Sequence, residues 1–145
     1  MPLSSNQIED LQAFAGTIIP ASADHGVPGA DDGPIFTEIL RSLGRDEDDV
    51  AAALTRLAVL AGGRFAALAP QRRLDIANLF RAEGGPALAA ISRVVLLCYY
   101  RDDRVMRSLG QEPRPPFPKG HVVEQGDWSL LDPVRQRKPF YRTVR

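Results

Sequence analysis

Apolar residues recur along the first part of the chain at the spacing that places them on one face of a helix. The pattern predicts a first helix from Ser4 to Ile19, and Pro20 ends it because a proline ring disfavours helical geometry in the preceding residue. The apolar face of this helix is formed by Ile8, Leu11, Ala15 and Ile18. A loop rich in glycine and aspartate follows over residues 21–33.

Four or five further helices are predicted by the same criteria, each bounded by proline, glycine or acidic residues. Their expected ranges are 34–43, 46–61, 70–83, 86–100 and a short segment from 102 or 103 to 109. The apolar run Val94–Tyr100 could alone be a buried strand, since a short run has no decisive period. No helix breaker separates it from Ala87–Ser92, so helix is the preferred interpretation.

The character of the chain changes after Gly110. Residues 111–145 hold six of the twelve prolines and show neither the helical nor the strand period. They also hold large apolar residues, which favour burial, so the segment is not composed like a disordered tail. The sequence therefore predicts an all-α fold. A bundle of five to six short helices occupies 1–110, and an extended, proline-rich C-terminal arm over 111–145 belongs to the same structural unit.

Charge and composition exclude several classes of function. The chain has 18 basic and 18 acidic residues, and acids interleave with the bases of its C-terminal end, which argues against nucleic-acid binding. No apolar run approaches the ~20 residues that a transmembrane helix needs. Residues 1–20 lack the basic start of an export leader, so we expect a cytoplasmic location. The single cysteine, Cys98, lies in an apolar run and is expected to be a buried thiol.

Catalytic and cofactor motifs are not found in the sequence. The two histidines, His25 and His121, lie in different loops without a cysteine or second histidine at metal-ligand spacing. No glycine-rich phosphate loop, nucleophile elbow or dinucleotide fingerprint is present. We therefore expect no catalytic, cofactor-binding or metal-binding residues in this chain, and hence a protein that is not an enzyme by itself. An enzyme that uses a histidine or the acidic loop is the less favoured alternative.

Aromatic residues next to cations suggest a contact with another protein, since tyrosine, tryptophan and arginine are enriched at the centres of interfaces. The candidate partner-binding residues are Tyr99, Tyr100, Arg104, Phe117 and Trp128. Two alternatives stay open at this point. The two tyrosines could belong to the core, and Trp128 could fold back on the helices of its own chain.

Two short motifs occur in order along the chain. The first is Thr17–Ala21 (TIIPA), followed by Asp24 and by Pro28-Gly29-Ala30. The second is the pair Tyr99-Tyr100, followed by Asp103-Arg104-Val105 and Leu109-Gly110. Together they resemble the motifs of the gluconate 2-dehydrogenase subunit 3 family. Each motif is short, but the two stand in the expected order and at the expected separation, spanning much of residues 8–110. The arm is less general in that family.

The resemblance implies a non-catalytic small subunit that binds and stabilises a larger flavoprotein of the glucose-methanol-choline (GMC) oxidoreductase type. FAD would be bound by that partner, which oxidises an alcohol or sugar hydroxyl, and a cytochrome c sometimes completes such complexes. The family often carries a twin-arginine leader, so a periplasmic location would apply if a leader had been removed. The alternative function is a stand-alone helical scaffold or regulator whose arm binds another protein.

Overall fold

The computed structural model describes residues 3–114 and 124–138 of the chain. Within these residues the secondary structure is helical, apart from one isolated antiparallel bridge between Ser22 and Val27. The predicted all-α class is therefore confirmed. The chain divides into two units, Met1–Pro113 and Arg114–Arg145, close to the boundary predicted at Gly110. That the helical body and the arm form a single structural unit stays a prediction.

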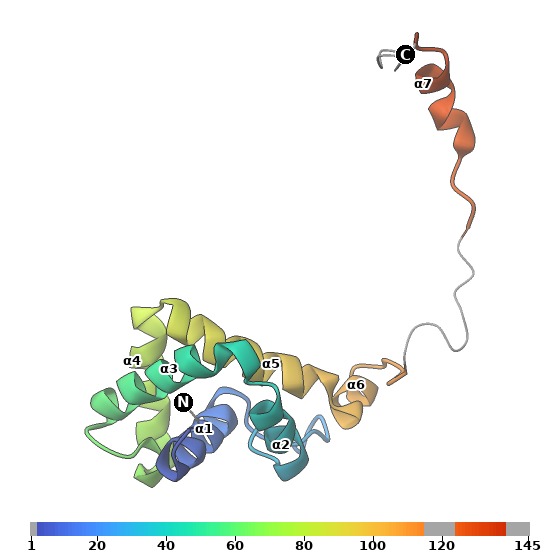
Figure 1. Ribbon diagram of the computed structural model, residues 1–145. Coiled ribbons are helices and arrows are strands. Elements are labelled where there is room, and N and C mark those ends of the chain that lie inside the picture. The colour runs from blue at the N-terminus through green and yellow to red at the C-terminus, as the bar shows by residue number, and fades with distance from the viewer. Residues whose placement is uncertain (1–2, 115–123, 139–145) are drawn as a thin grey trace. The chain divides into compact units, whose positions relative to one another are not determined.

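The first unit is a bundle of short helices (Figure 1). Its elements are α1 (Ser5–Ile18), α2 (Gly33–Arg41), the 3₁₀ turn η1 (Gly44–Asp46), α3 (Glu47–Ala61), the 3₁₀ turn η2 (Phe65–Ala67), α4 (Pro70–Glu83), α5 (Pro86–Arg101) and α6 (Asp103–Ser108). Helix α3 packs against α4 and α5, and α1 packs against α4 and η2. Helices α2 and α6 both contact α5, so α5 is in contact with α2, α3 and α6.

Local sequence signals set the helix ends, close to where the sequence predicted them. Ser4 is the N-cap of α1, and its hydroxyl accepts a hydrogen bond from the N–H of Gln7 while the Gln7 side chain accepts one from the N–H of Ser4. Gly62 ends α3 in the left-handed conformation, with a φ of 69°. Helix α2 is shorter than predicted and ends at Arg41, because the chain turns into η1 while Leu43 stays buried.

The centre of the core is a cluster of three phenylalanines. The ring of Phe14 meets those of Phe65 and Phe80 edge to face, at centroid distances of 5.8 Å in both pairs. A buried carboxylate lies beside this cluster: Asp10 is 5% exposed, and its Oδ1 accepts a hydrogen bond from the N–H of Ala66 at 2.8 Å. That bond fixes η2 against α1. Cys98 is a buried free thiol, as expected.

The described part of the second unit, residues 124–138, contains the 3₁₀ turn η3 (Trp128–Leu131) and the single helical turn α7 (Asp132–Arg135). The sequence predicts an extended arm here, because it shows neither the helical nor the strand period. Two local signals explain the short helical segment: Asp127 caps η3 by accepting from the N–H of Ser129 at 3.0 Å, and Pro133 suits the first turn of α7. Phe117 lies outside the described residues.

Candidate partner-binding surface

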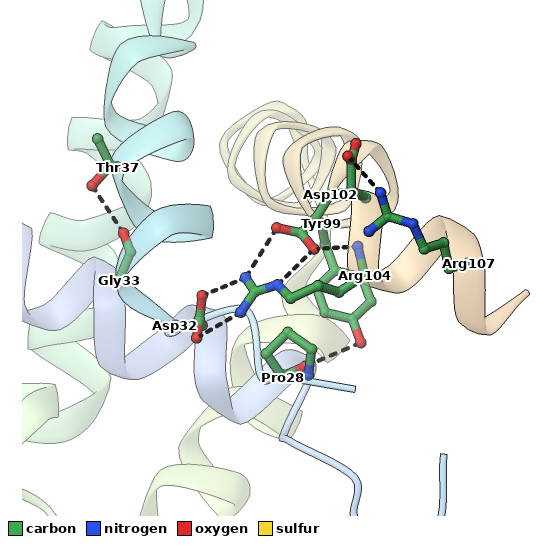
Figure 2. A network of polar contacts seen from close by, with 9 residues as sticks. Pro28, Asp32, Gly33, Thr37, Tyr99, Asp102, Arg104 and Arg107 are labelled. Atoms are coloured by element: carbon green, nitrogen blue, oxygen red, sulfur yellow. Dashed lines mark hydrogen bonds and ion pairs between the residues drawn. The ribbon is translucent and has the colours of Figure 1, made fainter. Parts of the chain in front are cut away.

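Two segments far apart in the sequence meet at one end of the first unit. The loop between α1 and α2 contacts the junction of α5 and α6 (Figure 2). The hydroxyl of Tyr99 donates a hydrogen bond to the carbonyl oxygen of Pro28 at 3.2 Å. The guanidinium of Arg104 donates to the carboxylate of Asp32, with an Nη2–Oδ2 distance of 2.6 Å. These contacts join the two segments that carry the family resemblance.

The α5–α6 junction holds these side chains in place through its own caps. Helix α5 ends at Arg101, and Asp102 is the N-cap of α6, with its Oδ1 accepting from the N–H of Arg104 at 2.9 Å. The same carboxylate accepts from the Arg104 side chain, with Nε–Oδ1 and Nη2–Oδ2 distances of 3.0 Å. Arg104 is therefore held by Asp102 within its own helix and reaches Asp32 across the loop, as Figure 2 shows.

The loop between α1 and α2 is ordered by its own backbone hydrogen bonds. The N–H of Ala30 donates to the carbonyl of Ile19 at 2.9 Å, which closes the loop, and Ala30 is fully buried. Gly29 lies in a tight place, because a Cβ there would lie 3.0 Å from the backbone nitrogen of Ala21 and 3.3 Å from the carbonyl oxygen of Ile19, and would also displace the Asp31 carboxylate. The PGA motif thus fits a place where the chain passes very close to itself.

Arg104 forms ion pairs with two aspartates at this end of the bundle. The hydrogen bonds from Arg104, first those of its side chain, hold the pKa of Asp102 below its usual range, and Asp102 and Asp32 raise the pKa of Arg104. Burial, with smaller contributions from the neighbouring Tyr100 and Asp102, raises the pKa of Tyr99. The site therefore holds the Tyr99 phenol beside the ion pairs of Arg104 with Asp102 and Asp32. Such solvent-exposed pairs contribute about 0–1 kcal/mol each, so their main effect is to position the loop.

Apolar side chains cover the outer face of α5 and the end of α6. Val94, Val95 and Cys98 point into the core, but Leu96, Leu97 and Tyr100 are 40%, 55% and 53% exposed. Leu109, just after α6, is 56% exposed and lines a shallow hollow together with Tyr100. A helix that is apolar on all sides is normally buried on all sides. We call the exposed set Leu96, Leu97, Tyr100 and Leu109 the α5–α6 face.

The hollow beside Tyr100 has a volume of about 220 Å³ and is lined by His25, Val27, Tyr99, Tyr100, Val105, Ser108 and Leu109. Ligand pockets usually measure ~300–1,000 Å³, so this hollow is the size of one inserted side chain. His25 is exposed, and its backbone N–H donates to the Ser22 hydroxyl at 3.3 Å. His121, the other histidine considered from the sequence, lies outside the described residues.

The structure describes four of the five candidate residues. Tyr99 lies in the core at 4% exposure, the alternative left open by the sequence, and so supports the surface from beneath. Tyr100 and Arg104 lie at the surface of the same end of the bundle. Trp128 belongs to the second unit and is 61% exposed, and Phe117 is not described.

Several members of the site were not found from the sequence. Leu96, Leu97 and Leu109 were not singled out, although the uniformly apolar run Val94–Tyr100 was the signal that could have identified the first two. The ion pair between Asp32 and Arg104 could not be found from the sequence, because 72 residues separate the two positions.

Neither a metal centre nor a membrane span emerges from the part of the chain that the structure describes. No group of three or more histidine, cysteine, aspartate or glutamate residues there is placed to hold a metal ion. In residues 3–114 and 124–138, no helix has the length and apolar composition needed to cross a bilayer. Comparison of the chain with protein-family models, curated proteins and solved structures finds no match.

Proposed function

We propose that this chain is the non-catalytic small subunit of an FAD-dependent dehydrogenase complex. It binds a larger flavoprotein of the GMC type and supports its folding and stability. The observation that carries the proposal is the contact between the two motif segments. Tyr99 and Arg104, from the second motif, bind Pro28, which belongs to the first motif, and Asp32, which follows that motif in the same loop. If each motif only stabilised its own helix, no contact between the two segments would be expected.

The α5–α6 face supplies the surface for such a partner. Covering the exposed half of one leucine side chain contributes ~1 kcal/mol. Three residues of the face lie within five positions of α5, and Leu109 lines the hollow together with Tyr100. Arg101 and Arg107 are exposed and lie next to this face in the sequence, and Arg107 pairs with Asp103 at 3.2 Å, so charged side chains border the apolar centre. This is the composition of a protein-binding surface.

The chemistry would belong to the partner. The flavoprotein would bind FAD and oxidise an alcohol or sugar hydroxyl, and a cytochrome c could accept the electrons in a larger assembly. The small subunit would act by holding the flavoprotein in its active fold. A cytoplasmic location of the complex belongs to the same proposal, and a periplasmic one would follow if a leader had been removed.

A second candidate function is a stand-alone scaffold or regulator that binds another protein through its C-terminal arm. The observation in its favour is the second unit, whose large apolar side chains Trp128, Leu130, Leu131 and Val134 are all exposed. This function requires no flavoprotein. It predicts that the arm alone, and not the α5–α6 face, determines binding.

Co-expression with a GMC-type flavoprotein from the same genome tests the proposal. Size-exclusion chromatography with flavin absorbance should show the two proteins eluting together, and the flavoprotein should be less soluble or less active when made alone. Leu97→Asp should abolish co-elution, because it places a carboxylate in an apolar contact. The matched control is Leu79→Asp, since Leu79 lies on α4 and is 53% exposed against 55% for Leu97. A chain that elutes alone and without colour would refute the proposal.

A further inference from the structure

Among residues 124–138, the apolar side chains of the second unit are exposed. Trp128, Leu130 and Val134 are 61%, 73% and 56% exposed, and all described residues of this segment are exposed. Its two elements, η3 and α7, have four residues each. Helices this short are marginal in water without a surface to pack on. The segment therefore has the properties of an element that gains its stability from binding.

Local hydrogen bonds nevertheless preform its shape. The Asp127 carboxylate accepts from both the N–H and the hydroxyl of Ser129, at 3.0 and 2.6 Å. The indole Nε1–H of Trp128 donates to Oε1 of Gln125 at 3.1 Å, which restricts the ring. Trp128, Leu131 and Val134 follow one another at three-residue spacing, the spacing that places side chains on one side of a 3₁₀ or α-helical turn. This is the arrangement of a helix that binds in a groove.

The charges of the segment are separated along its length. Arg135, Arg137 and Lys138 all follow the apolar residues, and the acids Glu124, Asp127 and Asp132 lie before or among them. Asp132 pairs with Arg135 at 3.3 Å, which leaves the cations in excess at the C-terminal end. A binding groove that complements this pattern has an apolar floor and acidic residues at the end that receives the cations. An anionic bilayer fits less well, because it would repel the acids that lie among the apolar residues.

We propose that residues 124–138 are a second docking element, which enters an apolar groove with an acidic rim on the flavoprotein. The inference rests on the proposed function, since it names the same partner. It adds that the chain binds at two points, the α5–α6 face and this segment. Because the two are covalently linked, binding of one makes binding of the other effectively intramolecular, and the affinity of the full chain exceeds that of either alone.

Three variants of the full chain test this inference against the purified flavoprotein. Trp128→Ala combined with Leu131→Ala removes two of the proposed anchors and should raise the dissociation constant ~30-fold or more, as for residues at the centre of an interface. Leu79→Ala is the matched control and should leave it unchanged. Arg137→Glu combined with Lys138→Glu should raise the dissociation constant at low ionic strength. The difference in dissociation constant between this variant and wild type should become smaller at high ionic strength.

Trp128 is the only tryptophan of the chain, so it also reports directly on its own surroundings. Replacing it with 5-fluorotryptophan in this chain alone gives one ¹⁹F resonance, which should shift and broaden when unlabelled flavoprotein is added. A resonance that stays at its free position in the complex, together with unchanged affinity of the Trp128→Ala, Leu131→Ala variant, would overturn the inference. The proposed function would stand in that case if Leu97→Asp still abolished binding.

Two other outcomes also decide the matter. If the wild-type chain does not bind the flavoprotein, the proposed function fails and the inference falls with it. If phosphatidylglycerol vesicles shift the Trp128 emission to the blue and the flavoprotein leaves the ¹⁹F resonance unchanged, the segment is a membrane-surface element and the inference is wrong.

Discussion

The adjacent residues Tyr99 and Tyr100 offer a matched test of how this end of the molecule is held together. Tyr99→Phe removes a buried hydroxyl that donates to the Pro28 carbonyl at 3.2 Å. Tyr100→Phe removes a hydroxyl from a side chain that is 53% exposed, and the edge-to-face contact between the two rings stays in both variants. The two substitutions therefore make the same chemical change in two environments.

The expected destabilisation by Tyr99→Phe is ~1 kcal/mol. A neutral hydrogen bond contributes about 0.5–1.5 kcal/mol, and the length of this one places it in the lower part of that range. Losing the donor also leaves the half-buried Pro28 carbonyl without this partner, which adds to the cost. For a chain of this size, ~1 kcal/mol lowers the melting temperature by about 3–5 °C. Tyr100→Phe should stay within ~0.5 kcal/mol of wild type.

Urea denaturation followed by circular dichroism measures both free energies of unfolding. In Tyr99→Phe, hydrogen exchange should also become faster in the loop over residues 20–32, which this bond fastens to α5. Burial raises the pKa of Tyr99, so the unfolded chain loses the phenolic proton at a lower pH than the folded one, and stability should fall as pH rises above about 10. In Tyr99→Phe the free energy of unfolding should fall less over this pH range, because the variant has no phenol at this position. Equal stabilities of the two variants, or a larger loss in Tyr100→Phe, would refute the reasoning.

Three further substitutions test other parts of the structure. Asp10→Ala should cost ~1–3 kcal/mol in thermal denaturation because it leaves the N–H of Ala66 unpaired, whereas Asp10→Asn keeps an acceptor and should cost less. The pKa of Asp102 is lowered in the folded chain, so the contribution of Asp102 to the free energy of unfolding should be lost as pH falls below about 4. In urea denaturation, Asp102→Asn should therefore lose less stability on acidification than wild type. An equal loss would contradict this. Gly29→Ala should destabilise the fold by ~1–3 kcal/mol through overpacking, seen as a lower melting temperature, and a stabilised variant would show that the loop has space.

The helices of the first unit were predictable because their signals are local. The capping box at Ser4 and Gln7, the prolines that begin α4 and α5, and the glycine that ends α3 each act within a few residues. The structure has the helices where these signals place them. The same reasoning missed the helical turns over Trp128–Arg135, because two short elements contain too few residues to show a period.

The candidate surface was only partly predictable. Tyr100 and Arg104 were identified by residue type, and the structure places both at the surface. Residue type could not separate Tyr99 from Tyr100, since the direction in which each side chain points depends on how α5 is rotated in the bundle. That rotation follows from the contacts of α5 with α2 and α3.

The sequence by itself determined the all-α class, the order and approximate ends of the helices and the change of character after Gly110. These properties depend on backbone preferences and apolar periods that operate over a few residues. Only the tertiary structure decided that the loop at Pro28 and Asp32 meets Tyr99 and Arg104, and that one side of α5 is uncovered. The physical reason is that such contacts join positions about 70 residues apart, where packing and not local preference selects the neighbours.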